Sequence, residues 1–154
     1  MSEYGDIVQG KCDAFADRVV KLNDYLLEQA SRKYDVRGRR YDAKSGNKRQ
    51  NSSHVPVFLQ SVASICNQLL RAGTSVGANN SEATSAISKA DYKSKSYIAL
   101  KEARESLYWI KLLYRNGYLE EKQFESISAD AEELVRILVS RCKKLDADAS
   151  KAEV

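Results

Sequence analysis

The sequence contains few of the residues that interrupt helices. Its 154 residues include one proline and seven glycines, and so few of them in this length favour long helices. No apolar run approaches the roughly 18 residues that a membrane-spanning helix needs. The start, Met-Ser-Glu-Tyr-Gly-Asp, is polar and unlike a signal peptide. We therefore expect a cytoplasmic protein of one domain that does not enter a membrane.

Motifs for catalysis and metal binding are also scarce. The single histidine, His54, follows two serines, but nothing supplies the orienting carboxylate and oxyanion site that a Ser-His pair requires. No phosphate-binding Gly-Lys loop or His-Glu zinc motif occurs. Cys12, Cys66 and Cys142 are widely separated, and we interpret them as reduced core thiols. We predict a non-enzymatic protein with no catalytic residue, metal or cofactor.

Apolar residues recur with a helical period in four segments. The first starts near residue 8 and runs for roughly 25 residues, with apolar spacings of three and four. The second starts near residue 54 and carries no charge from Val55 to Leu70, so we expect it to be buried on more than one side. The third covers about 85–116 and the fourth about 120–145.

Short connections between the later segments favour antiparallel neighbours. The expected fold class is therefore all-α, as an up-down-up-down four-helix bundle. We expect one domain over residues 1–145, with a long basic loop at about 34–54, and a polar C-terminal tail at 146–154.

Positive charge is concentrated in residues 32–49, which we call the basic segment. It holds eight cations and two acids, a net charge of +6, whereas the rest of the chain holds 17 cations and 19 acids. Cations neutralise phosphates in any nucleotide sequence, and tyrosines among them can stack on unpaired bases. The predicted nucleic-acid-binding residues are Arg32, Lys33, Arg37, Arg39, Arg40, Lys44, Lys48, Arg49 and Tyr41.

Two other interpretations of the positive charge stay open. The basic segment is also compatible with a solvated loop that binds nothing. A second cationic cluster is expected at the opposite end of the bundle, where acids dilute it and helix-dipole capping is the simpler explanation. That cluster consists of Lys89, Lys93, Lys95, Arg141, Lys143 and Lys144.

The stretch LRAGTSVGANNSEA, from Leu70 to Ala83, has two glycines one helical turn apart. Gly73 and Gly77 are predicted to let a neighbouring backbone approach closely, and Asn79 and Asn80 to end the helix. The expected packing and assembly residues are Gly73, Gly77, Arg71, Arg104 and Trp109.

Two stretches resemble a known family. QLLRAGTSVGANNSEA (68–83) and SKADYKSKSYIALKEARESLYWIKLLYRNGYL (88–119) are similar to the four-helix proteins encoded by intervening sequences of bacterial large-subunit ribosomal RNA genes. That family includes the accessory variability determinant proteins of diversity-generating retroelements. The resemblance implies a homopentamer that binds RNA or DNA and, in the retroelement branch, a reverse transcriptase. The competing hypothesis is an oligomeric protein-interaction scaffold with no direct nucleic-acid role.

Overall fold

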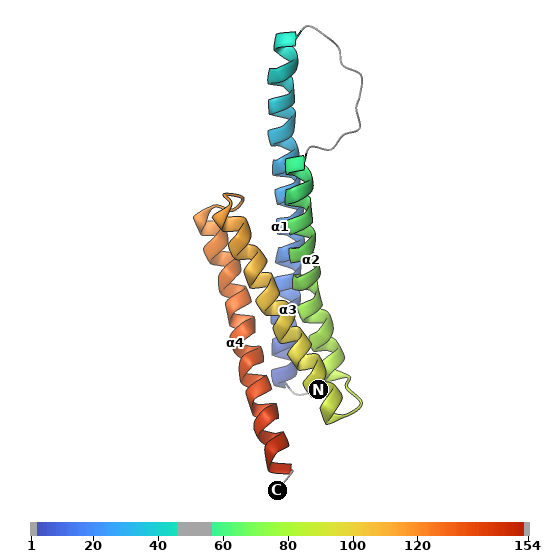
Figure 1. Ribbon diagram of the computed structural model, residues 1–154. Helices are drawn as coiled ribbons and strands as arrows, with labels where there is room; N and C mark the ends of the chain where they lie inside the picture. Colours follow the sequence, from blue (N-terminus) through green and yellow to red (C-terminus); the bar gives the residue numbers. More distant parts are fainter. Residues whose placement is uncertain (1–2, 46–56, 153–154) are drawn as a thin grey trace.

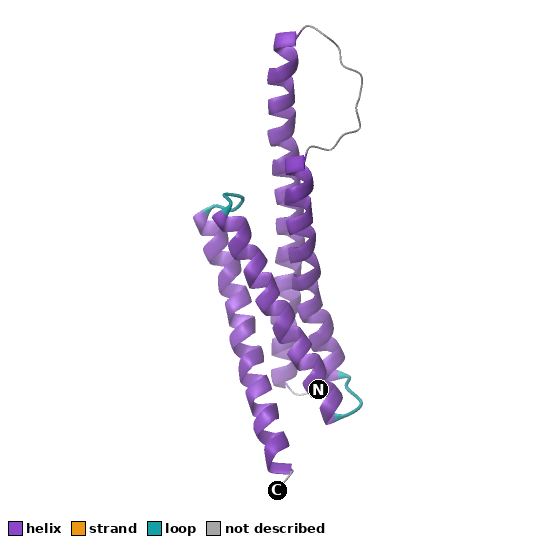
Figure 2. Ribbon diagram, viewed as in Figure 1, coloured by secondary structure: helices purple, strands orange, loops and turns teal. Residues whose placement is uncertain are grey.

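Four helices make up the described part of the chain. The computed structural model describes the backbone of residues 3–45 and 57–152, and side chains within 5–33 and 59–151. The helices are α1 (Glu3–Ser45), α2 (Val57–Thr84), α3 (Lys89–Arg115) and α4 (Glu121–Ala152). Figure 2 shows helices and short turns and no strand in these ranges. The all-α class predicted from the periodicity is confirmed.

Consecutive helices pack as antiparallel neighbours. α2 packs against both α1 and α3, α3 packs against α4, and α4 makes a smaller contact with α1 (Figure 1). The core lies where the apolar stripes of all four helices meet, and each contributes a side chain that is at most 1% exposed, such as Phe15, Leu69, Ile110 and Leu134. Burial of such a side chain stabilises the fold by about 1.5–3 kcal/mol. The three cysteines are free and buried, as predicted.

The connection between α2 and α3 is a short turn that a serine closes. Ser88 has extended backbone dihedrals, and its side-chain hydroxyl accepts a hydrogen bond from the backbone N–H of Asp91 at 3.1 Å. Asp91 in turn accepts a hydrogen bond from the backbone N–H of Ile87. This reciprocal capping fixes the start of α3, because it satisfies donors that have no partner within the helix.

A glycine ends α3. Gly117 has a φ of +71°, in the left-handed region where a side chain would be strained. The backbone N–H of Gly117 bonds to the carbonyl of Tyr114, and that of Tyr118 to the carbonyl of Leu113. This pattern terminates a helix.

The prediction of a loop at about 34–54 is wrong for its first part. α1 continues as a helix to Ser45, and Figure 1 shows it extending past the end of the α3–α4 hairpin. Arg, Lys and Ala have high helix propensity, and a projecting helix needs no apolar stripe. The missing apolar period therefore did not indicate a missing helix. Residues 46–54 of the predicted loop lie outside the described residues.

Two helix ends were also placed too early. α2 runs to Thr84 and does not end at Asn79 and Asn80, because the Asn80 side chain finds hydrogen-bond partners in the bundle interior. The predicted C-terminal tail is helical through Ala152. Asp146, within that tail, accepts a hydrogen bond from the Tyr97 hydroxyl, which ties the end of α4 to α3.

Candidate nucleic-acid interface

The basic segment lies largely on the projecting part of α1. Arg32 and Lys33 are exposed, and Arg32 forms an ion pair of 2.6 Å with Glu28 one turn earlier. Arg37, Arg39, Arg40, Tyr41 and Lys44 also lie on α1, although their side chains are outside the described set. Lys48, Arg49 and His54 lie outside the described residues. The part of α1 that bears Arg37, Arg39 and Arg40 extends past the end of the α3–α4 hairpin (Figure 1).

Three of the six cations in the second predicted cluster are engaged within the protein. Lys93 forms an ion pair of 2.9 Å with Asp146, and Lys95 forms one with Glu82. Arg141 is half-buried and donates a hydrogen bond to Asn80. The structure therefore does not assemble these cations into one free patch, in agreement with the low rank given to this cluster.

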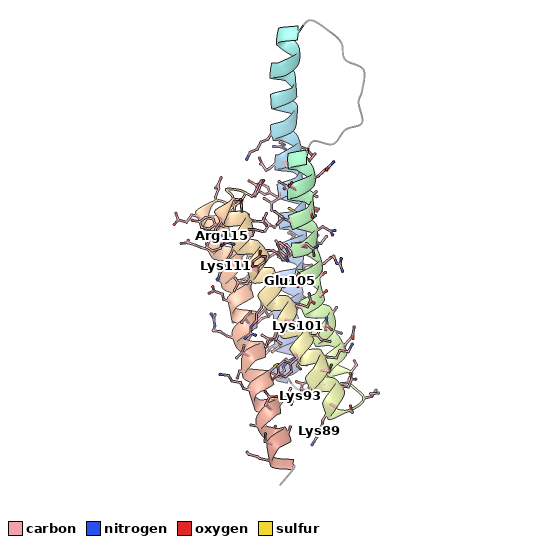
Figure 3. All side chains as sticks on the ribbon, in the orientation of Figure 1. Lys89, Lys93, Lys101, Glu105, Lys111 and Arg115 are labelled. Atoms are coloured by element: carbon pink, nitrogen blue, oxygen red, sulfur yellow. The ribbon has the colours of Figure 1, made fainter. Side chains whose placement is uncertain are left out.

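A third cationic surface was not predicted from the sequence. Seven residues of α3 fall within an arc of about 80° around the helix, at 3.6 residues per turn. We call them the α3 arc: Lys93, Tyr97, Lys101, Arg104, Tyr108, Lys111 and Arg115. The arc contains five cations, two tyrosines and no acid. It spans about 33 Å along the helix at 1.5 Å per residue, and Figure 3 labels four of its cations along α3.

Most of the α3 arc is open to solvent. Lys101, Arg104 and Arg115 are exposed and form no ion pair with any carboxylate of the described residues. Lys111 lies 4.0 Å from Glu132 of α4, a loose and largely hydrated pair. Tyr108 is 52% exposed, so its ring is available for stacking.

Acidic side chains lie beside the α3 arc rather than within it. Glu105 accepts a hydrogen bond of 3.0 Å from the indole N–H of Trp109. Glu102 lies farther around the helix, where burial and then the neighbouring Glu105 raise the pKa of its carboxyl. Both carboxylates flank the arc on its α2 side, which leaves its centre positive.

The α3 arc could have been found from spacing alone. Its members from Tyr97 to Arg115 recur at spacings of 4, 3, 4, 3 and 4, the same period as an apolar stripe. Tyr97 also fits the apolar spacing of this segment, but it is 36% exposed. Reading the charged residues with the same period would have separated this outer face from the buried one.

The predicted packing residues divide into two groups. Gly73 and Gly77 are buried in the α1–α2 contact, where a Cβ added at Gly73 would lie 2.9 Å from a methyl of Val19. Arg71 and Arg104 are exposed in the single chain, and Trp109 is half-buried. Gly73 is thus in close contact with the side chain of Val19 rather than with a backbone. A role of Arg71, Arg104 and Trp109 in assembly stays a prediction.

Sequence reasoning also missed a buried polar cluster at Asn80. The side chain of Asn80 is 0% exposed and lies between Gln9 of α1 and Arg141 of α4.

Within the described residues, no group of three or more potential metal ligands occurs. The same ranges contain no helix with the length and apolar character to span a bilayer.

Comparison with known proteins places this arrangement in a family. The family described as 23S rRNA-intervening sequence protein matches residues 56–140, which cover α2, α3 and most of α4. The chain belongs to this family. A crystal structure of a protein of unknown function from the S23 ribosomal protein family of Bacteroides thetaiotaomicron VPI-5482 is 34% identical, with a TM-score of 0.68. The alignment covers 90% of this chain and 97% of the other. No curated protein matches.

The family match agrees with the resemblance found in the sequence. Both of the stretches quoted above, 68–83 and 88–119, fall inside the matched residues. The α3 arc falls inside them as well, whereas the basic segment on α1 precedes them. The two cationic surfaces of this intervening-sequence protein therefore belong to different parts of the fold.

Proposed function

We propose that the protein is a non-enzymatic, homo-oligomeric accessory protein that binds RNA or DNA. The observation that carries the proposal is the α3 arc, where Lys101, Arg104 and Arg115 form no ion pair within the described residues and Tyr108 is exposed. Phosphates bind such cations with release of counterions, and exposed tyrosines stack on unpaired bases. The basic segment adds a second set of cations on the projecting part of α1.

The role of such an accessory protein is to hold nucleic acid for a partner that processes it. The resemblance to retroelement accessory proteins makes a reverse transcriptase the partner of choice, and a homopentamer the expected assembly. Five copies would repeat each cationic surface five times around one axis, which strengthens attraction to a polyanion without any new contact.

Salt-dependent binding of single- and double-stranded RNA and DNA tests the proposal. The α3-arc variant carries Lys101→Gln, Arg104→Gln, Lys111→Gln and Arg115→Gln. The slope of log K against log salt should become less steep by about 3, because each lost phosphate contact reduces the steepness of that slope by roughly 0.7–0.9. A basic-segment variant with Arg37, Arg39, Arg40, Lys48 and Arg49 changed to Gln tests α1 separately.

A charge-matched control distinguishes the effect of one cationic surface from the effect of the protein's net charge. Lys21→Gln, Lys122→Gln, Arg136→Gln and Lys143→Gln remove four exposed cations that lie outside both surfaces. This control should retain most of the affinity. Unchanged affinity in both the α3-arc and the basic-segment variants, or equal loss in the control, would contradict the proposal.

The competing function is a protein-interaction scaffold, and one observation favours it. α2 carries no charge from Val57 to Leu70, yet Leu59, Ile65 and Leu70 are only partly buried in the single chain. A second copy would cover them. Light scattering should then give a multiple of 17.3 kDa, about 86 kDa for five copies. An oligomer that binds no nucleic acid at low salt would favour the scaffold.

A further inference from the structure

A buried polar cluster connects three helices at the end of the bundle where α4 finishes. Asn80 of α2 donates a hydrogen bond from its Nδ2 to Gln9 Oε1 of α1 at 2.7 Å. The Oδ1 of Asn80 accepts a hydrogen bond from Arg141 Nη1 of α4, also at 2.7 Å. The Nε2 of Gln9 in turn donates a hydrogen bond to Asp13 Oδ1 at 2.7 Å. Each polar group of Asn80 is thus satisfied, and the guanidinium of Arg141 is fixed in position.

Arg141 is a half-buried cation that has no counter-ion among the described residues. No carboxylate of the described residues forms an ion pair with it, and Asp13 bonds to Gln9 instead. Its Nε is buried and has no hydrogen-bond partner. The ring of Tyr92, whose centroid lies 5.8 Å from the guanidinium carbon, compensates for only part of the lost hydration. An unpaired buried donor on a charged group is destabilising, and an anion bound beside Arg141 would remove this cost.

The guanidinium lines an open cleft. The Arg141 cleft has a volume of about 480 Å³, and its lining residues are Tyr92, Ser140, Arg141, Lys144, Leu145 and Asp148. Lys144 supplies a second cation and Ser140 a hydroxyl. The one acid, Asp148, forms no ion pair with either cation. A cleft of this size suits a small organic ligand.

A larger and more apolar cavity adjoins the Arg141 cleft. It has a volume of about 670 Å³ and shares Tyr92, Leu145 and Asp148 with the cleft. Alanines from α2, the α2–α3 turn, α3 and α4 form much of its remaining wall. The two spaces together place Arg141 and Lys144 next to a mainly apolar cavity, whose lining also includes Lys89 and Lys93.

We infer that the Arg141 cleft binds a small organic anion, with a phosphate or carboxylate head at Arg141 and Lys144 and an apolar body in the adjoining cavity. Arg141 Nη1 is already bonded to Asn80. The Nε and Nη2 donors of the guanidinium are left for the head, and together they form the paired geometry that oxyanions prefer. Because the Nε is buried, we expect the Arg141 side chain to shift slightly when the head binds. The inference does not depend on nucleic-acid binding by the α3 arc.

Calorimetric titration of the full chain tests this site with defined probes. Phenyl phosphate and phenylacetate carry the two possible heads on the same ring, and benzyl alcohol is a neutral analogue. At least one of the two anions should bind, and the Arg141 Nε–H signal in a nitrogen-proton NMR spectrum should shift with the same concentration dependence. Comparing the two anions decides the head group. Binding of neither anion, or equal binding of benzyl alcohol, would overturn the inference.

Two variants localise the binding. Asn80→Asp puts an internal carboxylate against Arg141, so anion affinity should fall about ten- to a hundredfold, the loss expected when hydrogen bonds to a charged group are removed. Lys144→Gln changes an exposed side chain and should weaken binding several-fold, whereas Lys143→Gln, one residue away and outside the cleft, should have no effect. Full affinity in both Asn80→Asp and Lys144→Gln would overturn the site.

Discussion

Gly73 offers the most direct test of how α1 and α2 pack. A Cβ at this position would lie 2.9 and 3.0 Å from the two methyls of Val19, closer than ordinary van der Waals contact. At Gly77 the nearest atoms would be Asp13 Oδ1 at 3.4 Å and Cys12 Cβ at 3.6 Å, which is ordinary contact. Gly10 lies on α1 and is exposed, and a Cβ added there would have no described neighbouring atom within 4 Å. Glycine to alanine at these three positions therefore separates steric crowding from helix propensity.

The expected free energies of unfolding follow from two opposing effects. Alanine in place of glycine in a helix stabilises by about 0.8–1 kcal/mol. Overpacking a tight contact destabilises by about 1–3 kcal/mol. Gly10→Ala should therefore raise stability by about 1 kcal/mol, and Gly77→Ala by a similar or smaller amount. The free energy of unfolding of Gly73→Ala should be about 1–3 kcal/mol lower than that of Gly10→Ala, because among the three substitutions only Gly73→Ala forces Val19 to move.

Urea and thermal unfolding at one fixed protein concentration measure these differences, since an oligomer would make the midpoint concentration-dependent. For a chain of this length, 1 kcal/mol moves the midpoint temperature by about 2–4 °C. In a Val19→Ala background, which removes both crowded methyls, Gly73→Ala should lose its penalty. The reasoning would be refuted if Gly73→Ala stabilised as much as Gly10→Ala, or if its penalty persisted without the Val19 methyls.

Three further outcomes are expected. Gly73→Leu should prevent correct folding or assembly, and a well-assembled variant would count against the close packing. Burial raises the pKa of the Cys12 and Cys66 thiols to about 11, so at about pH 8 a thiol reagent should label them far more slowly in native than in unfolded protein; equal rates would contradict their burial. Hydrogen bonds, from Tyr97 first and then Lys93, lower the pKa of Asp146 below its ordinary 3.8. A depressed folded pKa gives stability that is present above the unfolded pKa and lost as pH falls through the folded one. Asp146→Asn should therefore flatten the decline of urea midpoint below about pH 4, and an unchanged decline would exclude this contribution.

The helices and the bundle could be predicted because the core uses local, periodic information. Val8, Cys12, Phe15, Val19 and Leu26 recur at helical spacing, and the structure buries all of them. The helix ends could be predicted only where a backbone signal is strong, as at Gly117, whose left-handed conformation few other residues adopt. The polar end of α1 lacks both kinds of signal, which is why a loop was expected there.

The candidate surfaces were less predictable. The net charge of residues 32–49 is a property of consecutive residues, so the basic segment could be recognised directly. The α3 arc is a property of one helix face, and it becomes visible only after the buried face has been separated from the exposed one. Tyr97 illustrates the difficulty, because an aromatic residue at an apolar spacing fits either face.

The sequence by itself determined the all-α class, the four amphipathic helices, the buried cysteines and the position of the strongest positive charge. Each of these follows from residue type and spacing within about one helix. Only the tertiary structure decided which cations are paired, that Lys101, Arg104 and Arg115 are open to solvent, and that Arg141 meets Asn80 across 61 residues of chain. Such contacts depend on the rotation of each helix about its axis and on its neighbours. Packing of the whole bundle sets these rotations, because the closely packed core admits few arrangements of its side chains.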